Sequence, residues 1–110
     1  MIEVEKLQQH LRKFADARDW EKYHSPKNLV MAMSVEMAEL MEHFEWMTEE
    51  QSLHINKETR HEVALEMADV LIYLVRMADR CGVDLDVAVQ TKLLLNAQKY
   101  PPAEKISDDG

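Results

Sequence analysis

The segment from Val63 to Met77, VALEMADVLIYLVRM, is the most apolar of the chain and constrains its fold more than any other. Its polar side chains are Glu66, Asp69, Tyr73 and Arg76. They are spaced by three, four and three residues, which places them on one stripe of an α-helix. Because the other faces are apolar, we expect this helix to be buried. Two carboxylates beside a core cost several kcal/mol per charge unless a partner compensates them, so the sequence predicts such a partner.

Periodic apolar patterns predict further helices and no strands, so the expected fold is all-α. Ser25 and Pro26 form a helix start signal, with Ser as N-cap and Pro in the first turn. Gly82 suits the end of the central helix, and Asp84 or Asp86 can cap the helix that follows. The four predicted helices span residues 2–18, 26–46, 57–80 and 85–99. This pattern predicts a four-helix bundle-like arrangement.

Length and charge restrict the possible partners. A chain of 110 residues predicts one domain, over residues 1–102, followed by a polar, flexible tail at 103–110. The net charge of −8 argues against nucleic acid or an anionic membrane surface as a partner. Residues 63–77 are too few and too charged to span a bilayer. The single cysteine, Cys81, fits a cytoplasmic location and is expected to be a small core residue.

Two pairs of carboxylates on different predicted helices suggest a metal site. Glu36 and Glu39 are three residues apart, as are Glu66 and Asp69, so each pair points to one side of its helix. One such pair alone is more often a solvated face. The apolar surroundings of the second pair favour a site instead, where four carboxylates would repel one another unless a cation is bound. Ligands of oxygen alone suit Mg²⁺ or Mn²⁺.

A different metal pattern is less favoured. Glu21 with His24, and Glu58 with His61, have the E-x-x-H spacing of di-iron bundles. However, His24 precedes a helix break, and the second pair lies in a polar first turn away from the apolar stripe. The remaining histidines are expected at the surface or in packing contacts rather than as ligands: His10, His43 and His54.

Other polar and aromatic residues have two interpretations. Arg76 is on the same stripe as Asp69 and is expected nearer the rim, where it could bind phosphate. The residues Lys92, Asn96 and Lys99 share one face of the last helix, either as ordinary surface groups or as phosphate ligands. Trp20 and Trp46 are expected in a core or interface, but either could stack on a base.

Four blocks of sequence resemble a known family. They are WEKYHSPKNL at 20–29, VEMAELMEHFEW at 35–46, EMADVLIYL at 66–74 and KLLLNAQKYP at 92–101. In this order they resemble the MazG-like all-α nucleoside triphosphate pyrophosphatases, closest to the small dCTP pyrophosphatase group. The resemblance covers nearly the whole chain, from about residue 7 to 101.

The resemblance implies a Mg²⁺-dependent enzyme that cleaves (deoxy)nucleoside triphosphates to the monophosphate and pyrophosphate, for cleaning the nucleotide pool. The metal ligands of the family fall on Glu36, Glu39, Glu66 and Asp69, of which Glu39 and Glu66 are our candidates for catalysis. The nucleotide-pocket positions fall on Trp20, His24, Asn28, Trp46, Tyr73 and Asn96, and the phosphate side on Lys92, Lys99 and Tyr100. The family is usually a homo-oligomer, a dimer or a dimer of dimers, in which a neighbouring subunit helps to close the pocket.

Two positions differ from the animal dCTP-specific members. Leu11 stands where they have His, and Leu94 where they have Asp. Strict dCTP preference therefore does not follow from the resemblance. Two alternatives stay open: another substrate of the superfamily, such as dUTP or phosphoribosyl-ATP, and a non-catalytic helical oligomer that binds a cation.

Overall fold

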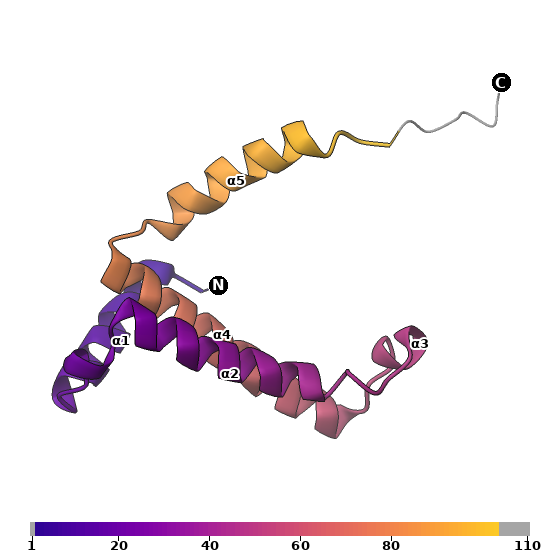
Figure 1. The fold of residues 1–110 in the computed structure, drawn as a ribbon, viewed down its shortest axis with the longest axis horizontal. Helices are drawn as coiled ribbons and strands as arrows, with labels where there is room; N and C mark the ends of the chain where they lie inside the picture. Colours follow the sequence, from indigo (N-terminus) through magenta and orange to yellow (C-terminus); the bar gives the residue numbers. More distant parts are fainter. Residues whose placement is uncertain (1, 104–110) are drawn as a thin grey trace.

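The computed structural model describes residues 2–103, which form helices joined by short turns (Figure 1). These are α1 (Val4–Ala17), the 3₁₀ helix η1 (Glu21–Tyr23), α2 (Pro26–Glu42), α3 (Glu49–Ser52), α4 (Lys57–Cys81) and α5 (Leu85–Lys99). No strand occurs within residues 2–103, so the all-α prediction is confirmed. Except for residue 103, the predicted tail lies outside the described residues.

The ends of the helices largely follow the predicted capping signals. The Ser25 side chain accepts a hydrogen bond from the backbone N–H of Asn28, and Asp84 caps α5 in the same way. At the end of α4, Gly82 has a φ of 69°, a left-handed conformation that suits glycine. The backbone N–H of Val83 then donates to the Ala78 carbonyl at 2.8 Å, as in a Schellman motif.

One predicted boundary is wrong, because α2 ends at Glu42 rather than at Trp46. The backbone N–H groups of Phe44 and Glu45 both donate to the Met41 carbonyl. This sharing of one acceptor tightens the last turn and ends the regular α-helical ladder. Residues 43–46 therefore form a turn that carries Trp46 away from the helix axis.

Helices α2 and α4 pack side by side as an antiparallel hairpin, with α3 at its closed end (Figure 1). Two contacts between side chains define how the helices align. His24, before α2, contacts Arg76 near the end of α4, and His43, after α2, contacts Glu66 in the first half of α4. Helix α1 packs on α4 as well. Between the two contacts, the middle of α2 faces the middle of α4.

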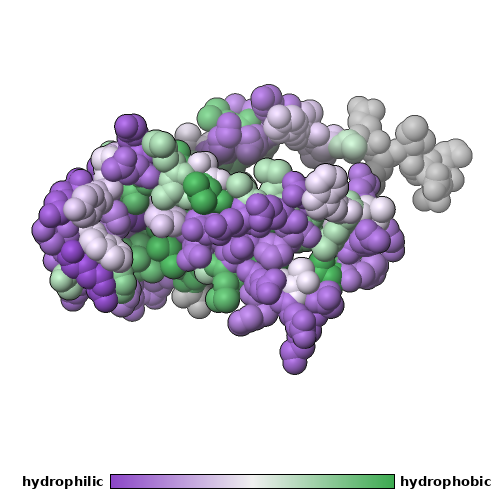
Figure 2. Space-filling model, turned by 60° about the horizontal axis from the view of Figure 1, so that its bottom comes forward, coloured by the Kyte–Doolittle hydropathy of each residue, from purple (hydrophilic) through white to green (hydrophobic). Residues whose placement is uncertain are grey.

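The core of one chain is small, and the helices do not close into a bundle. Its buried apolar residues are Ala15, Leu29, Val63, Val75 and Ala78, while α5 contributes none and stands away from α2 (Figure 1). The prediction that α4 is buried on all its apolar faces is wrong for a single chain, since Leu65 and Met67 are exposed. Figure 2 shows such apolar side chains among polar ones on the surface. The radius of gyration is 18.6 Å, against about 13 Å for a compact domain of this length.

Cys81 is exposed, so its predicted place in the core is wrong. It is the last residue of α4 and precedes the exposed turn at residues 82–84. Among residues 2–103 there is no helix that is both long and apolar enough to cross a membrane.

Candidate functional site

The four predicted metal carboxylates lie on the facing helices of the hairpin. Glu36 and Glu39 are in the second half of α2, and Glu66 and Asp69 are in the middle of α4. Partial burial raises the pKa of the Glu36 carboxyl, and the negative charges of the other three, Glu39, Asp69 and Glu66, raise it further. The structure thus brings all four close enough to repel one another.

The Glu66 side chain is partly buried and lies against a histidine that sequence reasoning had assigned to surface or packing positions. Nε2 of His43 is 2.8 Å from Oε2 of Glu66, and Nδ1 of His43 is 3.9 Å from the Glu62 carboxylate. The Glu66 Oε2 atom is buried, yet among the described residues it receives no hydrogen bond of acceptable geometry. A buried carboxylate oxygen without a full partner is costly, so this atom has capacity for a further ligand.

The side chains as they stand do not form a complete metal site. Within residues 2–103, no three His, Cys, Asp or Glu side chains converge as ligands of one ion. The donors are nevertheless all carboxylate oxygens, they raise the pKa of Glu36, and the buried Glu66 oxygen lacks a hydrogen bond. These properties fit a hard divalent cation such as Mg²⁺ better than the softer metals. In the E-x-x-H alternative of Glu21 and His24, arginines of α4 bind both side chains.

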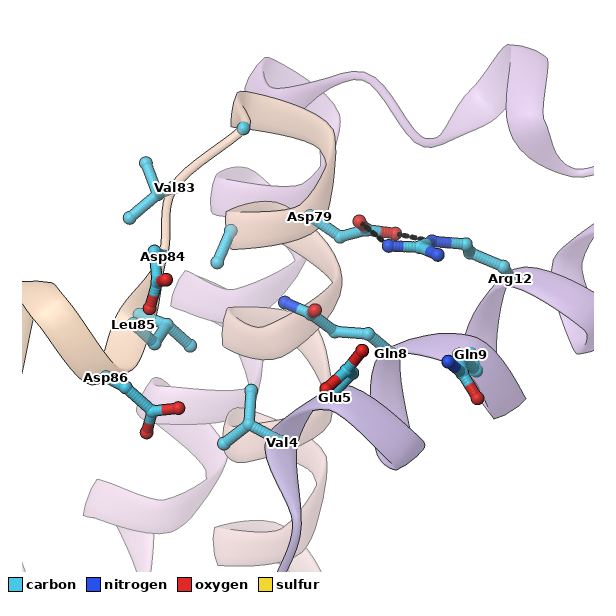
Figure 3. A pocket seen from close by; sticks show the side chains of 12 residues that line it. Val4, Glu5, Gln8, Gln9, Arg12, Asp79, Val83, Asp84, Leu85 and Asp86 are labelled. Carbon is cyan, nitrogen blue, oxygen red and sulfur yellow. Dashed lines mark hydrogen bonds and ion pairs between the residues drawn. The ribbon is translucent and has the colours of Figure 1, made fainter.

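Arg76 is buried, so its predicted position near the rim is wrong. Its side chain is enclosed between α4, α1 and the connector of residues 20–24, and the residue is 4% exposed. The guanidinium Nε donates to Nδ1 of His24 at 3.2 Å, and Nη1 donates to Asp79 at 3.4 Å. Asp79 also accepts two hydrogen bonds from Arg12 of α1, at 2.7 and 2.6 Å (Figure 3). Periodicity could not show this because Arg12 and Asp79 are far apart in the sequence.

Arg12, Arg76 and Arg80 contribute to shifts in the pKa of two neighbouring groups, the Asp79 carboxyl and the His24 imidazole. Hydrogen bonding to Arg12 lowers the pKa of the Asp79 carboxyl, and the charges of Arg76 and Arg80 contribute. Burial lowers the pKa of the His24 imidazole, and the charges of Arg76 and Arg80 lower it further. The charged groups around the adjoining hollow, of about 280 Å³, are Arg12 and Asp16 from α1, Glu21 from η1, and Arg76, Asp79 and Arg80 from α4.

We expect the protein to lose stability as the pH falls below about 6.5, the ordinary pKa of histidine. The folded state resists protonation of His24 while the unfolded chain takes up the proton, so acidification favours unfolding. One such group contributes a slope of up to about 1.4 kcal/mol per pH unit. Urea unfolding of wild type and of His24→Asn, which keeps an acceptor but does not titrate, measures this slope. Equal slopes in the two proteins would contradict the assignment.

The predicted nucleotide residues of the connector are partly occupied within the chain. The Trp20 ring, 40% exposed, lies 5.5 Å from Phe14 and 5.9 Å from His24 between ring centroids. The Asn28 side chain donates to the Tyr23 carbonyl at 3.1 Å. Asn28 therefore holds the connector in place, while one side of Trp20 remains available to solvent.

The remaining predicted substrate residues are not brought to one place in a single chain. Tyr73 is half-buried one turn beyond Asp69 on α4, and Trp46 is 89% exposed in the turn after α2. Neither tryptophan is in the core of this chain. The other four lie on or just after α5, which stands away from α2 (Figure 1): Lys92, Asn96, Lys99 and Tyr100.

Two hollows lie on the surface of the described residues, and neither is lined by any of the four predicted metal carboxylates. The larger, of about 470 Å³, lies between α1 and the turn from α4 to α5, and Gln8, Asp84 and Asp86 are among its residues (Figure 3). It begins at Ala78, which is about 20 Å along α4 from Glu66. The smaller hollow lies beside Arg76. Neither of these two hollows therefore marks the carboxylate face.

Comparison with known proteins identifies the family. The sequence profile of the MazG-like family matches residues 31–108, most of the chain, and includes the four carboxylates. The chain belongs to the MazG-like family. This confirms the resemblance found in the four sequence blocks.

Individual relatives and a solved structure agree with the family. The chain is 46% identical to dCTP pyrophosphatase 1 of Homo sapiens and 44% identical to that of Bos taurus, each over 90 residues. These matches cover 80% of this chain but 53% of each relative, so the chain spans about half the length of the curated relatives it matches. A crystal structure of a pyrophosphatase from Archaeoglobus fulgidus is 40% identical, with a TM-score of 0.85 over 93% of this chain and 95% of that one.

Proposed function

We propose that this MazG-like chain is a Mg²⁺-dependent nucleoside triphosphate pyrophosphohydrolase. The proposed substrate is dCTP or a related deoxynucleoside triphosphate, and the products are the monophosphate and pyrophosphate. The observation that carries the proposal is the group of four carboxylates across α2 and α4, in which Glu39, Asp69 and Glu66 raise the pKa of Glu36 and the buried Glu66 Oε2 lies 2.8 Å from Nε2 of His43. The identity to proteins named dCTP pyrophosphatase supports the choice of substrate.

The carboxylates are proposed to bind the cation and, in one case, to accept a proton as well. Glu36, Glu39, Glu66 and Asp69 would hold the cation. When bound, Mg²⁺ supplies positive charge against the negative charge that develops on the phosphoryl oxygens and the departing pyrophosphate. Glu39 is exposed and is our candidate for accepting the proton of the attacking water, while Glu66 is fixed against His43.

The nucleotide is proposed to lie between aromatic and basic residues from different helices. The base would pack on Trp20, Trp46 or Tyr73, with His24 or Asn96 at its edge and Asn28 supporting the connector. Lys92, Lys99 and Tyr100 would bind the phosphates. Because these residues are on or just after α5, which stands away from α2 in one chain, we propose that a second copy supplies them to the carboxylates (Figure 1).

A homo-oligomer, a dimer or a dimer of dimers, is therefore part of the proposal. In support, α5 has no buried residue and many of its apolar side chains are exposed. The radius of gyration also exceeds that of a compact domain. A second copy that packs on α5 would bury this surface and close the carboxylate face.

A panel of substrates tests the function directly. The purified chain is incubated with the natural deoxynucleoside triphosphates, dUTP and phosphoribosyl-ATP, and released pyrophosphate is measured with Mg²⁺ or with a chelator. We expect Mg²⁺-dependent pyrophosphate release from dCTP or a related deoxynucleotide. Turnover of phosphoribosyl-ATP or dUTP alone would assign another substrate. No turnover, together with stabilisation by Mg²⁺, would indicate a non-catalytic cation-binding oligomer.

A further inference from the structure

Two arginines of α4 hold the connector that carries Trp20. Arg76 donates from Nε to the His24 ring, and Arg80 donates from Nε to the His24 backbone carbonyl at 3.0 Å. Arg80 also binds the Glu21 carboxylate through Nη1 at 2.8 Å. The connector is thus attached to α4 through both its side chains and its backbone.

We propose that Arg76 and Arg80 form a clamp that fixes Trp20 for the nucleoside base, and that Arg76 is a positioning residue rather than a phosphate ligand. This inference deepens the proposed function and rests on it for the identity of the ligand. The His24 imidazole connects the clamp to Trp20, the proposed base-binding ring: it accepts a hydrogen bond from Arg76, and its centroid lies 5.9 Å from that of the Trp20 ring. Phe14 also contacts Trp20, with 5.5 Å between the ring centroids and an angle of 65° between the ring planes.

The Arg76 guanidinium is buried and uses two of its five N–H donors inside the chain. The side chain is 5% exposed, Nε is bound to His24, and Nη1 is bound to Asp79. Asp79 in turn binds Arg12 in a bidentate pair that joins α1 to α4 (Figure 3). A phosphate that took either of these two donors would displace His24 or Asp79 from a buried hydrogen bond. The burial and the hydrogen bonds therefore favour a supporting role.

The clamp requires one form of His24. Because the Arg76 guanidinium has only donors, Nδ1 of His24 must offer its lone pair, so the ring is neutral with its proton on Nε2. A protonated ring could not accept this bond and would face the positive charges of Arg76 and Arg80. The lowered pKa of His24 agrees with this geometry.

Binding of two nucleotides by Arg76→Lys distinguishes the two roles. The ligands are dCMP and the non-hydrolysable α,β-imido analogue of dCTP, with Mg²⁺, measured by calorimetry; another base replaces cytosine if the substrate panel selects it. Lys keeps the charge but loses the planar Nε donor. A positioning role predicts that both affinities fall by the same factor, about tenfold. Loss of affinity for the triphosphate analogue alone would overturn the proposal and assign Arg76 to phosphate.

Arg12→Gln is the matched control, since Arg12 binds the same Asp79 but does not contact His24. We expect it to leave the affinities for both nucleotides unchanged. Fluorescence of Trp20 in a Trp46→Phe background gives a second readout: Arg76→Lys should shift the emission and Arg12→Gln should not. A shift of equal size in both variants would contradict a specific clamp.

The ring ¹⁵N shifts of His24 in wild type test the clamp without any variant or nucleotide. We expect the neutral form protonated at Nε2, with Nδ1 unprotonated. Protonation at Nδ1 at neutral pH would overturn the clamp even if the enzyme is active. Conversely, if the wild type neither binds nor cleaves any nucleotide, the proposed function fails, while the ring shifts and the Trp20 emission still decide the clamp.

Discussion

Replacement of Glu66 by glutamine is expected to reduce Mg²⁺-dependent pyrophosphate release by about 10³-fold or more, since a lost metal ligand removes several kcal/mol of transition-state stabilisation. Glu66 combines a position among the four carboxylates with a buried oxygen, Oε2, that lies 2.8 Å from Nε2 of His43. Glutamine has nearly the same shape but no charge. Initial rates of pyrophosphate release over a range of Mg²⁺ concentrations measure the loss.

The melting temperature provides a readout besides activity. Without a divalent cation, the variant should be as stable as wild type or slightly more so, because one of four repelling charges is removed. Mg²⁺ should raise the melting temperature of wild type and not that of Glu66→Gln. Glu62→Gln is a matched control on the same helix, since Glu62 is exposed and lies 3.9 Å from His43. Retained activity in Glu66→Gln, or an equal loss in Glu62→Gln, would refute the assignment of Glu66.

The helices and most of their ends could be predicted because their signals are local. Ser25 with Pro26, Asp84 and Gly82 each act on backbone groups within one turn of themselves. The end of α2 could not be predicted in this way, because the turn at residues 43–46 has no glycine or proline to mark it. Here the shared Met41 carbonyl ends the helix.

Burial was harder to predict, because periodicity shows which face is apolar but not what covers it. Arg76 and Cys81 illustrate the two errors. Arg76 is buried, and Asp79 and His24 both bind its guanidinium. Periodicity could not reveal these contacts, because His24 and Arg12, the other partner of Asp79, are distant from α4 in the sequence. Cys81 is exposed, although the hydrogen bonds that join α4 to α1 and to the connector involve its neighbours Asp79 and Arg80. Each outcome depends on contacts between elements rather than on the pattern within one.

The candidate site could be predicted only in part, because local spacing places each carboxylate pair while contacts between elements complete the site. The spacing of three within each carboxylate pair is a local property, and the antiparallel hairpin then brings the pairs together. The contact of His43 with Glu66 depends on where the turn after α2 lies, so the spacing gave no sign of it. If the residues of α5 belong to the site, they do so through the proposed oligomer, which no pattern in one chain describes.

Replacement of Leu93 by aspartate is expected to break the proposed oligomer. Leu93 is 62% exposed in one chain and lies one turn from exposed Val89, so the two form an apolar stripe on α5. Burial of a leucine contributes about 1.5–3 kcal/mol, and burial of an unpaired carboxylate opposes association further. We expect the dissociation constant to rise by about 10²-fold or more, with monomers seen by light scattering after gel filtration.

The same variant links assembly to chemistry. If α5 of one copy supplies Lys92 and Asn96 to the carboxylates of another, Leu93→Asp should lose pyrophosphate release at concentrations where it is monomeric and regain part of it at higher concentration. Thr91→Asp adds the same charge at an exposed polar position two residues from both Val89 and Leu93, on the opposite face of the helix, and should leave both assembly and activity intact. A Leu93→Asp monomer with wild-type activity would show that one chain completes the site alone. The carboxylate face on α2 and α4 would then be the whole catalytic surface.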